Sequence, residues 1–221
     1  MINMVKLKWL GHAAWLISFE KINIVIDPFL TGNPTAAIKP EELENISYVI
    51  ISHNHQDHVG DAYMIAKKNN CPIVAMYDTA MQAKSNGVEN IIGMNKGNLR
   101  DIGGIEVGLT DAIHSGNESG IIMRADGVTI YHAGDTALFG DMSLIKKLYA
   151  PDIALLPIGG FFTMGPKEAL EAVKLIGAKV TIPMHYNTFE QIKQDPAIFA
   201  EMCKGITNVV ILSPGEEYIH Q

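Results

Sequence analysis

Four potential metal ligands follow directly after a buried strand in this chain. The apolar segment 48–51 is rich in Val and Ile and predicts a strand buried on both faces. The next residues, Ser52-His53-Asn54-His55-Gln56-Asp57-His58, include three imidazoles and one carboxylate. Functional groups gather at strand ends in α/β folds, and this mixture of donors suits zinc, manganese or iron. The run therefore predicts a metal site, with a solvated polar loop as the alternative.

The size and composition of the chain restrict its class. Its 221 residues fit one domain, 1–221, that can bury a core without disulfides. A net charge of −7 and scattered Lys and Arg residues argue against a nucleic-acid partner, which needs a basic footprint. We expect a cytoplasmic protein, because no apolar stretch approaches the roughly 18 residues of a membrane helix and the start lacks a secretory signal pattern. Cys71 and Cys203 are expected to be reduced core thiols.

Strand-like and helix-like segments alternate along the chain. Segments rich in Val and Ile predict strands at 6–10, 14–19, 23–26, 48–52, 73–76, 91–92, 105–110, 120–124, 129–132, 153–157, 180–183 and 209–212. Helical patterns lie near 59–69, 78–86, 141–149, 166–176 and 196–204. Two similar hairpins, 16–27 and 121–135, each end at an Asp and indicate a weak internal repeat. These patterns predict a mixed α/β fold of two β-rich halves meeting near 110–118, with sheets stacked face to face and helices outside.

The spacing within the ligand run indicates which donors act together. His53 and His55 are two residues apart, so in extended backbone they point to one side. Asp57 and His58 are expected at the first turn of a helix beginning near 59–61, where the helix dipole favours a carboxylate. The pair His53 and His55 cannot easily share one ion with the pair Asp57 and His58, so the spacing favours two adjacent metals. Three further donors stand at predicted strand ends: His114, Asp135 and His185.

Together these residues resemble the signature of the metallo-β-lactamase superfamily. The match is to His-x-His-x-Asp-His at 53–58, followed by a His, an Asp and a His in the order of the family. Further segments resemble the compact branch of metal-dependent hydrolases related to the ascorbate-6-phosphate lactonases: Gly11-His12-Ala13, Asp27-Pro28-Phe29, His132-Ala133-Gly134-Asp135-Thr136, Leu156-Pro157-Ile158-Gly159-Gly160 and His185-Tyr186-Asn187-Thr188-Phe189. The resemblance spans essentially the whole chain and implies a four-layer αββα sandwich of two pseudo-symmetric halves. Asn54 and Gln56 depart from it, because related sequences often carry smaller residues there.

The resemblance also implies a ligand set and a chemistry. His53, His55 and His114 would hold one divalent ion, and Asp57, His58 and His185 the other. Asp135 would bridge the two ions, with zinc or manganese favoured and iron as a further option. The implied reaction is hydrolysis by a metal-bound hydroxide, since paired cations lower the pKa of bound water toward roughly 7.

Several residues have more than one interpretation. His12 is either a structural histidine at a strand end or, like His132, a candidate catalytic residue that donates a proton or contacts an anionic substrate. His132 could instead orient a metal ligand through a hydrogen bond without contacting the metal itself. Asp57 is the third candidate catalytic residue, because it could also orient the nucleophile. Asp27 either starts a turn or holds a metal-bound histidine, and the loop 159–166 is either a plain connection or part of a pocket wall.

The expected function is that of a dinuclear metal-dependent hydrolase acting on a small anionic ester, lactone or phosphoester. A phosphodiesterase or nuclease is the alternative enzyme, which the acidic balance disfavours. A metal-loaded binding protein without turnover is a third hypothesis. The expected partner is a small-molecule substrate, without nucleic acid or membrane. The sequence leaves open whether the chain forms a homo-oligomer.

Overall fold

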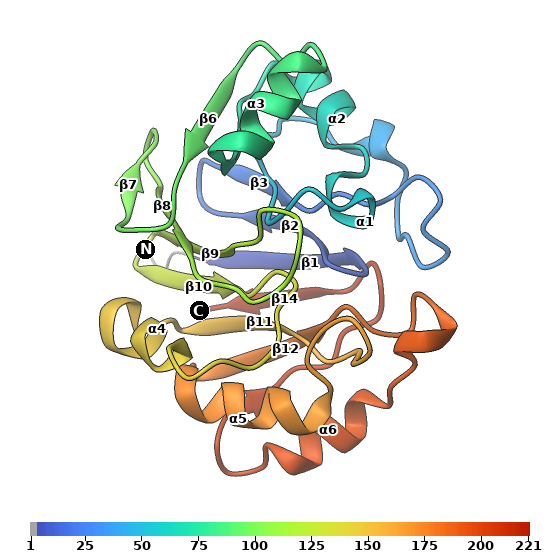
Figure 1. Ribbon diagram of the computed structural model, residues 1–221, viewed down its shortest axis with the longest axis vertical. Helices are drawn as coiled ribbons and strands as arrows, with labels where there is room; N and C mark the ends of the chain where they lie inside the picture. Colours follow the sequence, from blue (N-terminus) through green and yellow to red (C-terminus); the bar gives the residue numbers. More distant parts are fainter. Residues whose placement is uncertain (1–3) are drawn as a thin grey trace. The chain divides into compact units, whose positions relative to one another are not determined.

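The computed structural model describes residues 4–221 and contains two seven-stranded sheets (Figure 1). The chain divides into two compact units, each built around one sheet. Unit 1 holds the described residues up to Lys96, together with Ser115–Asn117 and Leu212–Gln221. Unit 2 holds Gly97–His114 and Glu118–Ile211.

The sheet of unit 1 has the strand order β14-β1-β2-β3-β4-β5-β6. Its first four strands pair antiparallel, and β3 to β6 pair parallel, with helices in the connections after β4 and β5. The elements are β1 Val5–Gly11, β2 Ala14–Ser18, β3 Asn23–Ile26, a 3-10 turn Pro40–Glu42, β4 Tyr48–Ile50, α1 Gln56–Val59, α2 Ala62–Asn69, β5 Ile73–Met76, α3 Tyr77–Ser85, β6 Ile91–Met94 and β14 Glu217–His220.

The sheet of unit 2 has the order β13-β12-β11-β10-β9-β8-β7. Here β7 to β10 pair antiparallel and β10 to β13 pair parallel. The elements are β7 Arg100–Asp101, β8 Glu106–Thr110, β9 Gly120–Ala125, β10 Val128–His132, α4 Met142–Tyr149, β11 Ile153–Pro157, α5 Pro166–Ile176, β12 Val180–Met184, a 3-10 turn Glu190–Ile192, α6 Pro196–Met202 and β13 Asn208–Val209.

The two sheets share one topology, which confirms the internal repeat. Each contains an antiparallel meander of three strands, an added antiparallel edge strand and three further parallel strands. The predicted meeting point near 110–118 is wrong, because β7 and β8 already pair within the second sheet. The predicted helix 59–69 is also interrupted: α1 ends at Val59 with Gly60 as its C-cap, and α2 begins at Ala62.

The strand that precedes the ligand run is buried on both faces, as predicted. Val49, Ile50 and Ile51 have no exposed surface. Val49 and Ile51 share a core with Ile65 of α2 and Ala80 of α3. Each such aliphatic side chain stabilises the fold by about 1.5–3 kcal/mol relative to exposure. The start of the ligand run is therefore attached to the centre of a packed sheet.

The cysteines behave as expected from the sequence. Cys71 and Cys203 are buried and free, and burial raises the pKa of each thiol to about 11. Neither thiol is therefore a thiolate near neutral pH. Among residues 4–221, no helix has both the length and the apolar character needed to cross a bilayer.

Gly60 provides a test of how α1 is held. Its φ is 40°, and a Cβ at this position would overlap with the backbone of Pro28 and Phe29. Gly127, in the β9–β10 hairpin, has a φ of 79° but open space around it. Gly60→Ala should lower the free energy of unfolding by about 3 kcal/mol, because overlap adds to backbone strain. Gly127→Ala should cost about 1 kcal/mol from strain alone. Urea denaturation measures both, and equal losses would contradict the overlap.

Candidate metal centre

Asp27 and the ligand run leave neighbouring strands at the same edge of the unit 1 sheet. Because β3 and β4 are parallel, the residues that follow them lie side by side. The backbone N–H of Asp27 donates to the Ile50 carbonyl at 3.1 Å. The buried Asp27 carboxylate accepts from the backbone N–H of Ser52 at 2.7 Å and from its hydroxyl at 2.6 Å. These bonds hold the carboxylate at the start of the run.

Hydrogen bonds that this carboxylate accepts, one from His58 and one from the Ser52 hydroxyl beside His53, set the tautomers of two histidines. Nδ1 of His58 lies 2.8 Å from Oδ2 of Asp27, and because a carboxylate only accepts, Nδ1 donates. Nδ1 of His53 lies 3.0 Å from the Ser52 hydroxyl, whose own proton goes to Asp27, so this Nδ1 donates as well. Both Nε2 atoms then present lone pairs, the form that binds a metal. The predicted contact of Asp27 with a histidine of the run is confirmed.

His53 and His55 converge although the backbone between them is not extended. The predicted strand 48–52 ends at Ile50, and the chain bends at 52–54. Nδ1 of His55 nevertheless lies 3.1 Å from Nε2 of His53, while its Nε2 lies 3.2 Å from the Ser115 hydroxyl. When Nε2 of His55 carries the ring proton and donates to Ser115, Nδ1 of His55 and Nε2 of His53 face each other with their lone pairs. A tetrahedral zinc ion 2.0–2.1 Å from each would hold them about 3.4 Å apart, so this pair fits a shared cation.

Asn54, which departs from the family pattern, has a structural partner. Its backbone N–H donates to the Gly116 carbonyl at 2.9 Å. Gly116 has a φ of 88°, and a Cβ there would overlap with the Asn54 side chain. This close approach holds the segment 115–117 against the ligand run within unit 1.

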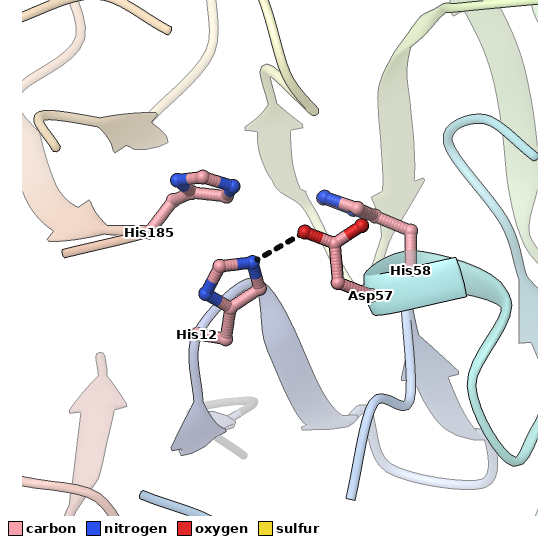
Figure 2. Close-up of side chains that lie close together, drawn as sticks. All are labelled: His12, Asp57, His58 and His185. Carbon is pink, nitrogen blue, oxygen red and sulfur yellow. Dashed lines mark hydrogen bonds and ion pairs between the residues drawn. The ribbon is translucent and has the colours of Figure 1, made fainter. Parts of the chain in front are cut away.

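The short helix α1 brings Asp57 and His58 next to His12 (Figure 2). Nε2 of His12 lies 3.3 Å from Oδ2 of Asp57, and one donor atom of each of these three residues lies within 4.8 Å of the others. Asp57 and His58 were expected at the first turn of a helix beginning near 59–61. That start is wrong, because both residues lie in α1, which begins at Gln56 and is separated from α2 by Gly60. His12 is fully buried with a φ of 55°. Its contact with Asp57 is established, whereas its role toward a substrate stays a prediction.

Unit 2 brings its own three predicted ligands together. His114, Asp135 and His185 follow β8, β10 and β12, which run in the same direction. Oδ2 of Asp135 lies 3.1 Å from Nε2 of His185 and 3.6 Å from Nε2 of His114. Asp135 and His185 are buried. The ends of three strands thus converge on one carboxylate.

Thr136 joins two of these segments. Its hydroxyl accepts from the backbone N–H of Ile113 at 3.0 Å and donates to the Ala137 carbonyl at 2.7 Å. The N–H of Ala137 donates to the Ile113 carbonyl at 2.9 Å. The chain before His114 is thereby paired with the chain after Asp135. No role for Thr136 was expected from the sequence, although its place directly after a predicted ligand was a signal.

Two further buried residues flank the unit 2 cluster. Nδ1 of His132 accepts from the Gly134 N–H at 3.1 Å, which supports the turn leading to Asp135. His132 is fully buried, and its catalytic role stays a prediction. Tyr186 follows His185, and burial raises the pKa of this phenol to about 12. It is therefore neutral near pH 7.

The donors in each unit fit divalent metal ions. The ligand run of unit 1 supplies three imidazoles and the Asp57 carboxylate, with the lone pairs of His58 and His53 directed by Asp27 and Ser52. Unit 2 supplies two imidazoles around the Asp135 carboxylate. Such mixed nitrogen and oxygen donors suit zinc, manganese or iron. Metal-binding histidines also typically donate their other ring N–H to a carboxylate, as His58 does to Asp27.

Comparisons with known proteins identify the family. The profile of the beta-lactamase superfamily domain matches residues 6–185. A UPF0173 metal-dependent hydrolase of Thermococcus kodakarensis is 52% identical over 225 residues, covering 97% of this chain and 99% of the relative. The chain belongs to this family of metal-dependent hydrolases. Another member, from Pyrococcus abyssi, is 49% identical, with 97% of this chain and 99% of that relative covered.

Solved structures share the fold. Igni18, a metallo hydrolase from the hyperthermophilic archaeon Ignicoccus hospitalis, is 38% identical, with a TM-score of 0.93 and coverage of 99% of both chains. The metallo-beta-lactamase fold protein YhfI from Bacillus subtilis is 15% identical, with a TM-score of 0.78 and coverage of 99% of this chain and 100% of that one. The predicted superfamily, fold class and hydrolase class are confirmed. The closer relationship to the ascorbate-6-phosphate lactonases stays a prediction.

The role of Asp27 can be tested by removing its charge. Asp27→Asn would direct amide protons at the donors of Ser52 and His58, so zinc affinity should fall about 10–100-fold. Asp61→Asn is the matched control, because this nearby carboxylate binds the N–H and hydroxyl of Thr31 at 2.8 and 2.7 Å. Competition with a chelator measures the affinities. Zinc affinity equal to that of the wild type in Asp27→Asn would contradict the assigned role.

Proposed function

We propose that the protein is a dinuclear metal-dependent hydrolase of a small anionic ester, lactone or phosphoester. The observation that carries this proposal is the buried Asp27 carboxylate, which sets His58 directly, and His53 through Ser52, as metal-binding tautomers. Relatives with about half of their residues identical are named metal-dependent hydrolases, which supports the same chemistry.

The proposed ligand assignment uses donors from both units. His53, His55 and His114 would hold one ion, and Asp57, His58 and His185 the other. Asp135 would bridge the ions. This pairing follows the resemblance to the superfamily, and each unit supports its own part: the nitrogens of His53 and His55 converge in unit 1, and both unit 2 histidines approach Asp135. Zinc or manganese is the proposed metal, with iron as a further option.

The residues around these ligands have distinct proposed tasks. When bound, the two ions would supply an activated water and polarise the scissile group. Asp57 would orient the attacking water and accept its proton. His12, 3.3 Å from Asp57, would hold that carboxylate in place and share its proton. His132 would hold the turn before Asp135. Like His12, it is a candidate for protonating the leaving group.

The proposed substrate is small and anionic because paired divalent cations form a strongly positive local field. A phosphodiesterase or nuclease is the alternative enzyme, which the net charge of −7 disfavours. A metal-loaded binding protein without turnover is the alternative outside catalysis. The cytoplasm is the proposed location, with a small molecule as partner.

Asp135→Asn tests the bridging assignment. The variant should lose hydrolytic activity and bind less metal, because an amide bridges two cations poorly, while the fold persists. Elemental analysis measures the metal content, and circular dichroism checks the fold. Asp141→Asn, at an exposed carboxylate of the same unit, is the control and should retain the wild-type metal content. An unaltered metal count in Asp135→Asn would refute bridging.

A substrate screen separates the three functions. The metal found in protein from native-like expression is restored, and lactones, esters, thioesters and phosphodiesters are then offered. Turnover of a small anionic member is expected. Activity that rises with nucleic-acid chain length and falls steeply with salt would favour the nuclease. Binding of these compounds without hydrolysis of any class would favour the binding protein.

A further inference from the structure

Two adjacent aromatic side chains are exposed on the loop between β11 and α5. Phe161 is 79% exposed and Phe162 is 51% exposed. Their ring centroids lie 4.7 Å apart at an interplanar angle of 77°, an edge-to-face pair. A single exposed apolar residue needs no explanation, but adjoining aromatic rings form a patch that favours contact with another apolar group.

The strand order places this loop between two of the candidate ligands. In the unit 2 sheet, β11 lies between β10 and β12, and all three strands are parallel. Asp135 follows β10 and His185 follows β12. Because parallel strands end at the same edge of a sheet, the loop after β11 leaves the sheet between the segments that carry these two residues.

Backbone contacts attach the loop to both of those segments. On one side, the N–H of Met164 donates to the Thr136 carbonyl at 3.0 Å, one residue after Asp135. On the other side, Gly159 lies so close to the His185 carbonyl that a Cβ would overlap with it. The aromatic pair is therefore connected through the backbone to the Asp135–His185 cluster.

The conformation of the loop is strained at Phe161 and is held by backbone hydrogen bonds. Phe161 has a φ of 57°, which is unusual and unfavourable for a bulky side chain. The N–H of Gly160 donates to the Met164 carbonyl at 2.9 Å, and the N–H of Phe162 donates to the Gly160 carbonyl at 2.6 Å. These bonds hold the strained turn in one defined shape. Strain of this kind is characteristic of functional sites.

We propose that Phe161 and Phe162 form an apolar wall that binds a hydrophobic organic group of the substrate. This inference rests on the proposed function and narrows its substrate class to amphiphilic molecules. The anionic head would lie at the metal ligands, and an aryl or alkyl group would pack on the two rings. The backbone connection to Asp135 and His185 favours the substrate over a second copy of the chain as the occupant.

Two phosphonates with the same head group test the wall. Zinc-loaded full-length protein is titrated with phenylphosphonate and with methylphosphonate in a calorimeter. The wild type should bind phenylphosphonate about tenfold more tightly, because the wall removes the phenyl ring from water. In the double variant Phe161→Asn and Phe162→Ala, the preference should fall to about twofold or less, with methylphosphonate affinity unchanged. Asn is chosen because it tolerates a positive φ.

Leu148→Ala is the matched control, since this α4 side chain in the same unit is 61% exposed. It should keep the preference for phenylphosphonate. Equal binding of both phosphonates to the wild type, or a preference that survives in the double variant, overturns the wall while the proposed function stands. Absence of binding of either phosphonate to the wild type also overturns the wall, whereas the proposed function is decided separately by the substrate screen. A double variant that sediments as a smaller assembly than the wild type also overturns the wall, because the rings would then join copies of the chain.

Discussion

The candidate centre of unit 1 depends on the hydrogen bonds that the buried carboxylate of Asp27 accepts. A carboxylate without exposure costs several kcal/mol unless hydrogen bonds offset the loss of water. Here the backbone and hydroxyl of Ser52 and Nδ1 of His58 supply those bonds. The same bonds direct lone pairs of His53 and His58 away from Asp27. The group that satisfies its own burial therefore also prepares the ligands for a metal, and one substitution should affect both.

Backbone strain occurs in the turns around the candidate ligands, as it does in other turns of the described residues, while regular elements carry the stability. His12, Asp27, His185 and Phe161 all have φ between 44° and 57°, the left-handed region that such residues rarely occupy. Each costs on the order of 1–3 kcal/mol and persists only where its surroundings hold it. The parallel strands provide that support, because β4, β11 and β12 are buried along their whole length. Their ends can then present strained turns that carry functional groups.

The repeated topology explains why both units supply donors from the same kind of position. In unit 1, Asp27 and the ligand run follow the parallel strands β3 and β4. In unit 2, Asp135, the aromatic loop and His185 follow β10, β11 and β12. Parallel pairing places consecutive loops at one edge, so each unit gathers residues that lie far apart in the chain. The use of the loop after β11 for an apolar group would extend the same arrangement from metal binding to substrate selection.

The sequence by itself determined the chemistry and most of the elements, because a dense run of donors and the spacing of Val and Ile are local patterns. It missed β7 and β14, since short edge strands carry little apolar periodicity, and it misplaced the boundary between units because strand pairing is not local. Only the tertiary structure decided the partners: Asp27 reaches His58 across 31 residues, and Ser115 reaches His55 across 60. Such contacts depend on sheet register and on positive φ, which no local pattern specifies. The residues were therefore predictable, whereas the nitrogen that each histidine presents was not.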